Sequence, residues 1–404
     1  MLIMSESESD NDDGRTHRTY AEILAERQND EGYATATSKE QDNVEIEVLK
    51  LYKLQMEPQL ISCTHIGFLK KSLIQLNEQY QCLDCSRPWL CYWILHTLQI
   101  LGEDLQNPKY SKVVGFLAKC QSPDGGFGGG PGQYPHLAST YAAVNALCII
   151  GTIEAYETIN RKGLLHFLTS LRGEDGAFSM HVDGEVDIRG VYCAITVAKL
   201  TNVYTLEMFK GSAEWIAQCQ TWEGGFGGCP GMEAHGGYAF CGIATLVLLG
   251  KSHLCHVPSL MRWLVNKQMR LEGGFQGRTN KLVDACYSFW QSGAFPLISA
   301  ILSNEGKVFD SNYWLFDQKA LQEYLLICCQ HPFGGLVDKP KKNSDLYHTC
   351  YAISGLSIAQ HSRQSVIVGH PNLNRVGVIH PVFNLIISTV SGALTYFGEL
   401  PIPD

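Results

Sequence analysis

The chain has 404 residues, of which 45% are hydrophobic and 10% aromatic, so one main domain with a large core can use most of it. A net charge of −9 argues against general nucleic-acid binding, because phosphate backbones attract basic surfaces. No apolar run approaches the roughly 18 to 20 residues that cross a bilayer, so the sequence predicts no membrane span.

The cysteines and the first residues of the chain both indicate the cellular compartment of the protein. Fifteen cysteines are spread along the chain without the short regular spacings of a disulfide framework, which favours reduced thiols. The first residues lead into an acidic run and lack the basic start and apolar stretch of a secretory signal. Both features predict a cytoplasmic protein.

The chain begins with a polar segment and then turns helical. Residues 1–45 are rich in Ser, Glu and Asp and carry few apolar side chains, so we expect a disordered acidic N-terminal extension. Apolar residues then recur mostly at three- and four-residue spacings, as in Ile66, Leu69 and Leu73, which is typical of amphipathic helices. This pattern predicts helices over 46–360, followed by a C-terminal tail over 361–404.

A repeat of about 50 residues runs through the helical region. Each copy is a glycine turn between two helix-like runs, and glycine supplies the positive φ angles that end helices. The repeat therefore predicts stacked helical pairs, which form either a solenoid or a closed barrel. The copies are at 124–127, 175–178, 223–226 and 272–275, with a weaker one at 332–336.

An aromatic residue recurs near the start of the helix that follows each turn. If the array closes, these rings line one aromatic cavity; the alternative is ordinary turn punctuation and core packing. The residues are Tyr141, Tyr192, Tyr238 and Tyr287.

Several long motifs resemble those of protein prenyltransferase β-subunits, and the farnesyl branch resembles them most. The resemblance covers about 45 to 360 and implies an all-α fold, an α/α barrel of alternating inner and outer helices. We expect the C-terminal tail to pack partly on this barrel. The motifs are DCSRPWLCYW at 84–93, GGGPGQYPH at 128–136, PGMEAHGGY at 230–238, KLVDACYSFW at 281–290 and DLYHTCY at 345–351.

Asp284, Cys286 and His348 are the metal-ligand candidates. Their spacing alone is a weak signal, and it also fits a capping carboxylate, a buried thiol and an interior histidine. The resemblance implies that they bind one zinc ion. Three protein ligands leave the fourth tetrahedral position open, and the resemblance implies that the thiol of a substrate protein occupies it.

A pair of cations precedes this segment. Arg278 and Lys281 are three apart, so at helical spacing they share a face; a solvated surface pair is the alternative. The resemblance implies that His235, Arg278, Lys281 and Tyr287 bind an isoprenoid diphosphate. It further implies that Asp338 supports magnesium on that diphosphate, with Lys342 nearby, although an Asp before Lys-Pro is also a common turn residue.

Aromatic residues form the expected walls for the isoprenoid and the peptide. By resemblance, Arg189, Tyr192, Tyr238 and Trp290 line the isoprenoid side. Trp89 is bulky, and in the family this shortens the isoprenoid pocket and favours 15 carbons over 20. The residues expected to shape the pocket for the last residue of the target are Ser86, Trp89, Trp93, Ala138 and Tyr347, with His136 nearby.

The resemblance therefore implies a catalytic β-subunit that transfers farnesyl from farnesyl diphosphate to the cysteine of C-terminal CaaX motifs. It also implies a heterodimer with an α-subunit. Three alternatives remain open from the residues: a geranylgeranyl-transferring β-subunit, a terpene cyclase of similar shape, and a helical-repeat binding module without metal or turnover.

Overall fold

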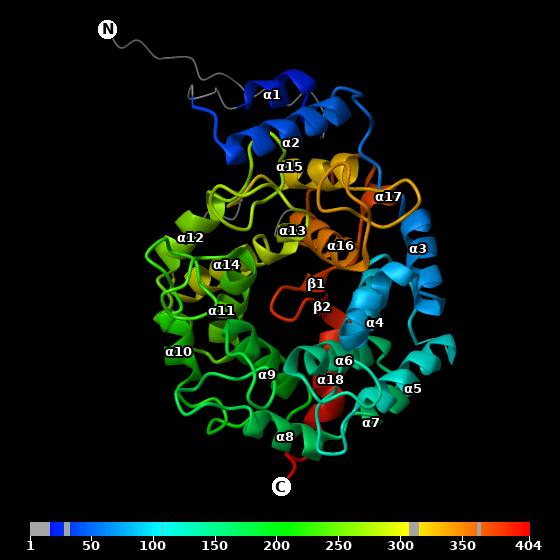
Figure 1. The fold of residues 1–404 in the computed structure, drawn as a ribbon, viewed down its shortest axis with the longest axis vertical. Coiled ribbons are helices and arrows are strands. Elements are labelled where there is room, and N and C mark those ends of the chain that lie inside the picture. The colour runs from blue at the N-terminus through cyan, green and yellow to red at the C-terminus, as the bar shows by residue number, and fades with distance from the viewer. Residues whose placement is uncertain (1–16, 28–32, 107, 307–314, 362–364) are drawn as a thin grey trace.

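A computed structural model describes residues 17–27, 33–106, 108–306, 315–361 and 365–404. It is a two-layered ring of helices (Figure 1), so the all-α barrel expected from the sequence is confirmed. Neighbouring inner helices pack in chain order, and the last packs against the first, which closes the ring. The inner helices are α4 (Arg87–Ile100), α6 (Leu137–Ile150), α9 (Ile188–Leu200), α11 (Gly236–Leu248), α13 (Tyr287–Trp290) and α16 (Leu346–Gln360).

The outer layer and the connections complete the repeat. The outer helices are α3 (Ser62–Ile74), α5 (Ser111–Cys120), α8 (Arg161–Ser170), α10 (Ser212–Gln218), α12 (Val257–Val265) and α15 (Gln318–Glu323), which continues into the π-helical η4 (Tyr324–Cys328). The remaining helical segments of the ring are η1 (Glu78–Ser86), η2 (Pro108–Tyr110), α7 (Ile153–Glu157), η3 (Ser252–Leu254) and α14 (Ala294–Asn304).

The inner and outer helices differ in how much of their surface is buried, as their sequences predict. Nearly every residue of α6 is buried, as expected for a helix that is apolar on all sides. Helix α12 instead buries one stripe, which includes Leu260 and Trp263, and leaves its other face to solvent. Among the described residues, no helix is both long and apolar enough to cross a membrane.

The glycine turns hold the layers together. Each of the first four predicted turns carries a phenylalanine that is fully buried, at positions 127, 178, 226 and 275, whereas Phe333 of the weaker fifth copy is exposed. Gly125 shows why glycine is required: its φ is +96°, and a Cβ there would lie 1.8 Å from the carbonyl oxygen of Gly163. At Gly125 the turn therefore lies directly against the backbone of the next outer helix, α8.

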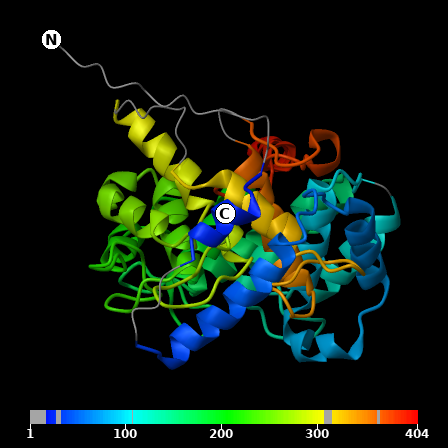
Figure 2. The same ribbon diagram turned by 90° about the horizontal axis from the view of Figure 1, so that it is seen from above.

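The expected disorder of residues 1–45 is wrong for part of that range. Helix α1 (Tyr20–Ala25) begins with a capping box of Thr19 and Glu22, and α2 (Ala36–Tyr52) starts well before the predicted helical region. Both lie on the outside of the ring beside α15 (Figures 1 and 2). Residues 1–16 and 28–32 lie outside the described part of the chain.

Contacts to distant residues explain why this polar segment is ordered. The Nε atom of Arg18 donates to Glu323 at 2.5 Å. The side chain of Gln41 donates to Glu272 at 2.6 Å, and the hydroxyl of Tyr52 donates to the carbonyl of Glu272 at 2.8 Å. Partners more than 200 residues away stabilise helices that local composition disfavours.

The C-terminal tail enters the ring. After α17 (Pro371–Asn374), strands β1 (Ile379–His380) and β2 (Leu385–Ile386) form a hairpin inside the ring of helices (Figure 1), and α18 (Ile387–Gly398) packs against α6 and α9. Asn384, at the hairpin turn, accepts a hydrogen bond from Tyr92 through its carbonyl and contacts His96 through its side chain. The tail thus fills the part of the ring that lies beyond the first turns of the inner helices, next to residues such as Tyr92 and His96.

Candidate active site

A cavity of 440 Å³ lies at the end of the ring where the inner helices begin. Its walls come from the first turns of these helices, whose N-termini carry partial positive charge. The four recurring tyrosines all line it, so that geometric expectation is confirmed. The lining residues are Leu83, Ser86, Trp89, Trp93, Ala138, Tyr141, Met180, Arg189, Tyr192, Cys193, His235, Gly237, Tyr238, Cys241, Tyr287, Trp290, Tyr347 and Tyr351.

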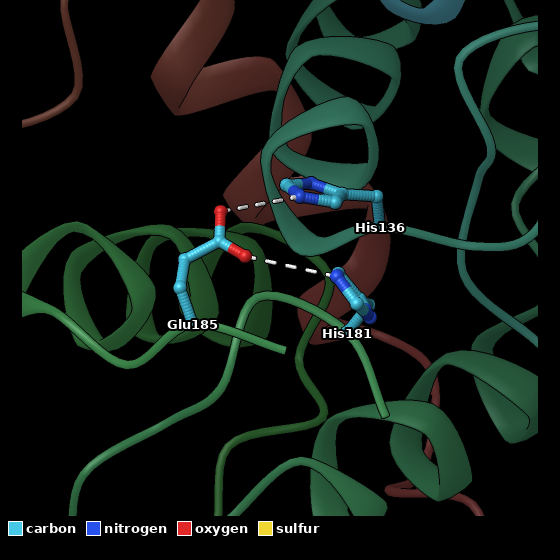
Figure 3. A group of neighbouring side chains, drawn as sticks. All are labelled: His136, His181 and Glu185. Carbon is cyan, nitrogen blue, oxygen red and sulfur yellow. Dashed lines mark ion pairs between the residues drawn. The ribbon is translucent and has the colours of Figure 1, made fainter. Parts of the chain in front are cut away.

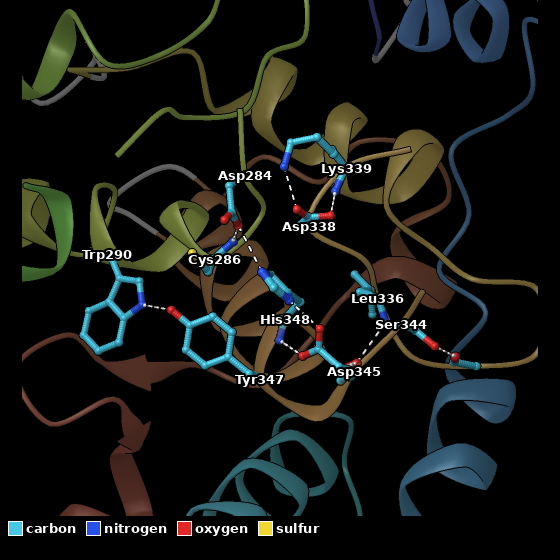
Figure 4. A network of polar contacts seen from close by, with 12 residues as sticks. Asp284, Cys286, Trp290, Leu336, Asp338, Lys339, Ser344, Asp345, Tyr347 and His348 are labelled. Atoms are coloured by element: carbon cyan, nitrogen blue, oxygen red, sulfur yellow. Dashed lines mark hydrogen bonds and ion pairs between the residues drawn. The ribbon is translucent and has the colours of Figure 1, made fainter. Parts of the chain in front are cut away.

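The three metal-ligand candidates meet beside this cavity. One ligand atom from each of Asp284, Cys286 and His348 lies within 4.8 Å of the other two. Asp284 and Cys286 immediately precede α13, His348 is in the first turn of α16, and these two helices pack together (Figure 4). The ring therefore joins residues that are 62 positions apart in the sequence.

Asp345 fixes the orientation of His348. Its carboxylate caps α16 by accepting the amide of His348 at 2.8 Å, and it also accepts from Nδ1 of the same residue at 2.6 Å (Figure 4). Because Nδ1 donates to Asp345, Nε2 is the ring nitrogen left to bind a cation, and it faces Asp284 Oδ1 at 3.3 Å. In zinc sites, a metal-binding histidine usually donates its other ring N–H to a carboxylate in this way.

The charges of the group fit a divalent cation. Burial lowers the pKa of His348, but hydrogen bonds to Asp284 and Asp345 raise it to about 10. Burial and the charge of Asp284 raise the pKa of the Cys286 thiol well above its usual value. Without a metal, these groups hold protons that a cation would displace, and a Cys-Asp-His set suits zinc.

The predicted isoprenoid and peptide residues share one aromatic surface. The rings of Trp89 and Trp93 are 5.6 Å apart, and Trp89 lies 5.5 Å from Tyr141. Tyr347 packs edge-on against Trp93 at 5.5 Å and accepts a hydrogen bond from Trp290 at 3.1 Å, and the ring of Trp290 lies 4.5 Å from that of Tyr351. Such rings offer a large, stiff apolar surface to a hydrocarbon chain.

Hydrogen bonds to residues outside the cavity lining hold Arg189 and Tyr192 in place. The guanidinium of Arg189 pairs with Asp187 at 2.6 Å, and this hydrogen bond raises the pKa of the arginine. The hydroxyl of Tyr192 donates to the carbonyl of Val382 in the tail at 2.8 Å. The tail hairpin therefore supports a cavity wall, although the sequence pattern assigned it no role.

His235 and Tyr287 form a polar pair at the cavity wall. Nδ1 of His235 accepts the amide of Gly237 at 3.1 Å, so Nε2 carries the proton and donates to the Tyr287 oxygen at 2.8 Å. Burial, then the charge of Arg278, lower the pKa of His235 to about 4. The Tyr287 ring packs on Gly277, where a Cβ would lie 2.0 Å from it.

The expected helical arrangement of Arg278 and Lys281 is wrong. The residues between them form a turn, with Asn280 at a φ of +61°, and α13 begins only at Tyr287. Arg278 pairs with Glu233 at 3.1 Å, Lys281 is exposed, and neither lines the cavity.

Asp338 lies near the metal-ligand group, but its carboxylate is engaged. It accepts the amide of Lys339 at 2.7 Å and the ammonium of the same residue at 2.5 Å (Figure 4). Its carbonyl accepts from Ala285, which ties this loop to the metal-ligand segment. Lys342 is exposed.

His136 does not line the cavity and belongs to a second polar group. Glu185 lies between His136, at 3.9 Å, and His181, at 3.6 Å (Figure 3). Nδ1 of His136 accepts the amide of Ala138 as the cap of α6, so Nε2 carries the proton in the neutral ring. His136 could bind a metal through Nε2 only by losing this cap, so this group fits a cation less well than the first.

The comparisons with known proteins agree with this geometry. The sequence pattern described as "Prenyltransferase alpha-alpha toroid domain" matches residues 60–385. "Protein farnesyltransferase subunit beta" of Arabidopsis thaliana is 37% identical, with 90% of each chain covered. The protein of the same name from Pisum sativum is 40% identical over 78% of this chain and 90% of its own.

A solved structure shares the fold. Candida albicans protein geranylgeranyltransferase-I complexed with GGPP matches 86% of this chain and all of its own, with a TM-score of 0.67 and 24% identity. The family pattern and the plant relatives each cover most of the ring that carries the site. The chain therefore belongs to the family of protein farnesyltransferase β-subunits.

Proposed function

We propose that this chain catalyses transfer of a farnesyl group from farnesyl diphosphate to the cysteine of a C-terminal CaaX motif, with zinc held by Asp284, Cys286 and His348. The observation that carries the proposal is the meeting of these three residues beside the aromatic cavity. Zinc would lower the pKa of a coordinated substrate thiol, so that the thiol reacts as the thiolate at neutral pH.

The cavity binds and orients the isoprenoid in this proposal. Its apolar chain packs along Tyr192, Tyr238 and Trp290, and the indole of Trp89 limits its length. Ser86, Trp93, Ala138 and Tyr347 are the proposed contacts for the end of the peptide. Holding both reactants in one water-poor cavity turns a two-body encounter into a pre-oriented reaction.

The leaving group departs toward positive potential. A sulfur–carbon bond forms, a carbon–oxygen bond breaks, diphosphate leaves with the electron pair, and the thiol proton passes to solvent. Because His235 donates to the Tyr287 oxygen, the hydroxyl proton of Tyr287 is free to hydrogen-bond a diphosphate oxygen as charge develops. The N-termini of the inner helices add to this stabilisation.

Arg278 and Lys281 are the proposed outer cations for the diphosphate. Arg278 must exchange Glu233 for phosphate oxygens, which an arginine can also bind through two parallel hydrogen bonds. The proposed support of magnesium by Asp338 likewise requires that its carboxylate leave Lys339.

We further propose an α-subunit partner and a cytoplasmic location. The names of the relatives, which are β-subunits, support a partner. Tyr134, Trp222 and Phe333, each more than four-fifths exposed, are aromatic side chains that such a partner could cover. All fifteen cysteines are free thiols, which fits a reducing compartment.

The test is transfer of labelled isoprenoid by this chain co-expressed with a candidate α-subunit. Farnesyl and geranylgeranyl diphosphate are each offered with peptides ending in Cys-a-a-Met or Cys-a-a-Leu. Farnesyl transfer that favours the Met peptide and stops on zinc chelation supports the proposal. Preferred geranylgeranyl transfer to the Leu peptide indicates the sister activity, and no transfer by a folded, zinc-free complex indicates a binding module.

A further inference from the structure

Two exposed cysteines stand three residues apart at the rim of the cavity. Cys82 and Cys85 both lie in η1, the 3₁₀ segment that leads into inner helix α4. Neither belongs to the metal-ligand group, and the proposed transfer uses neither. The sulfur of Cys82 donates only a weak hydrogen bond to the carbonyl of Gln79 at 3.3 Å, and that of Cys85 lies 3.8 Å from the Ser86 hydroxyl.

The local backbone keeps these two residues close together, although a kink at Leu83 lies between them. A 3₁₀ turn rises about 2 Å per residue, so the Cα atoms of residues i and i+3 are about 6 Å apart. That separation lies within the range that a disulfide spans, but the Cβ atoms must approach further than an ideal turn allows. The backbone of Leu83, between them, already departs from helical angles at φ −101° and ψ 18°. A disulfide here is therefore feasible and strained.

One end of this turn cannot move. The carbonyl of Cys85 packs directly on Gly129, where a Cβ would lie 1.8 Å from that oxygen. The amide of Arg87 donates to the Gly129 carbonyl at 2.9 Å, and the side chain of Gln133 donates to the Asp84 carbonyl at 3.1 Å. The adjustment needed to join the cysteines must come from the Cys82 side of the turn.

That adjustment reaches the cavity. Leu83 lies inside the loop that a disulfide would close, and it lines the cavity together with Ser86 and Trp89. These side chains face the part of the cavity proposed for the end of the peptide. A shift of Leu83 therefore alters peptide binding, while the metal-ligand group on α13 and α16 stays as it is.

We propose that Cys82 and Cys85 form a reversible disulfide that weakens binding of the substrate peptide. The oxidant is a low-molecular-weight disulfide such as oxidised glutathione. One cysteine loses its proton, attacks a glutathione sulfur and releases one glutathione thiol; the second cysteine then displaces the other. Two protein S–H bonds are lost, one protein S–S bond forms, and the glutathione disulfide is reduced to two thiols.

The strain of the disulfide sets the redox conditions under which it forms. Strained, exposed disulfides have higher reduction potentials than structural ones, so a reducing cytosol keeps this pair open. The bond forms when the glutathione pool becomes oxidised and reopens when the pool recovers. The effect on transfer rests on the proposed function, whereas the disulfide itself does not.

The test uses the purified heterodimer equilibrated in glutathione buffers from reducing to oxidising, then freed of glutathione before assay. Mass spectrometry after alkylation measures the disulfide, and steady-state farnesyl transfer to a reduced peptide gives KM and kcat. We expect a Cys82–Cys85 disulfide, a peptide KM raised by at least about threefold with kcat little changed, and recovery on reduction.

The matched variants are Cys82→Ser, Cys85→Ser and Cys63→Ser. The first two should resist oxidation, whereas Cys63→Ser, which removes an exposed cysteine of α3 outside the pair, should respond like the unaltered chain. Absence of the disulfide in oxidising buffer overturns the proposal, whatever the activity. A disulfide without a change in KM, or equal inactivation of Cys85→Ser, overturns its effect on the peptide.

Discussion

Replacing Asp345 by Asn should weaken zinc binding with little loss of stability. The Asn oxygen can still accept the His348 amide and cap α16, but its NH₂ group then faces Nδ1 of His348, where the Asp carboxylate accepted a hydrogen bond. The ring must switch to the tautomer that protonates Nε2, the atom proposed to bind zinc. In the zinc-bound form, where this switch is not possible, the 2.6 Å charged hydrogen bond is lost, which costs about 1.5–3 kcal/mol of zinc binding.

This magnitude predicts a loss of zinc affinity of about 10- to 100-fold, the range measured when such carboxylates are removed. The assay is competition for zinc with a chelator of known affinity, alongside thermal unfolding of the zinc-free protein. Asp317→Asn is the matched control, because Asp317 caps α15 in the same way without a histidine partner. Zinc affinity of Asp345→Asn within about twofold of the unaltered chain would refute the reasoning.

Three further predictions concern Trp89 in the cavity wall, Asn384 in the tail hairpin and the buried side chain of Glu272. Trp89→Ala should raise the geranylgeranyl-to-farnesyl ratio of kcat/KM by at least about tenfold by lengthening the cavity; an unchanged ratio contradicts the proposed wall. Asn384→Ala should lower the free energy of unfolding in urea by about 2–3 kcal/mol, since it leaves buried His96 without its partner and places Ala at a φ of +50°; Asn384→Gly, which lacks that strain, should lose less. Burial raises the pKa of Glu272 to about 7, so the folded chain binds more protons than the unfolded one between about pH 4.5 and 7, and stability should fall as pH rises through this window. Glu272→Gln should reduce this fall in stability. An identical pH dependence of stability in both proteins would contradict a raised pKa of Glu272.

The repeat made the stacked helical pairs predictable from sequence, and the resemblance to prenyltransferase β-subunits implied that they close into a ring. Glycine turns at regular spacing indicate identical units, and residues at the same place in each unit must lie at the same height once the ring closes. That is why Tyr141, Tyr192, Tyr238 and Tyr287 could be placed on one cavity. The resemblance of the motifs at 281–290 and 345–351 to those of the family implied that Asp284, Cys286 and His348 meet, a geometry that spacing alone could not establish.

Features that depend on distant contacts were not predictable in the same way. The ordered helices α1 and α2 rest on partners such as Glu272 and Glu323, which composition cannot reveal. The position of the tail hairpin depends on hydroxyls of Tyr92 and Tyr192. Asp345 did carry a local signal, since an Asp three residues before a helical His both caps the helix and reaches the imidazole.

Measuring zinc content and farnesyl transfer together, in the heterodimer and its ligand variants, decides whether Asp284, Cys286 and His348 hold a catalytic zinc. We expect one zinc per chain, and loss of both zinc and transfer in Cys286→Ala and in His348→Ala. Cys219→Ala, which removes another buried cysteine away from the cavity, should retain both. Stoichiometric zinc in both ligand variants, or full transfer by the zinc-free complex, would contradict the account.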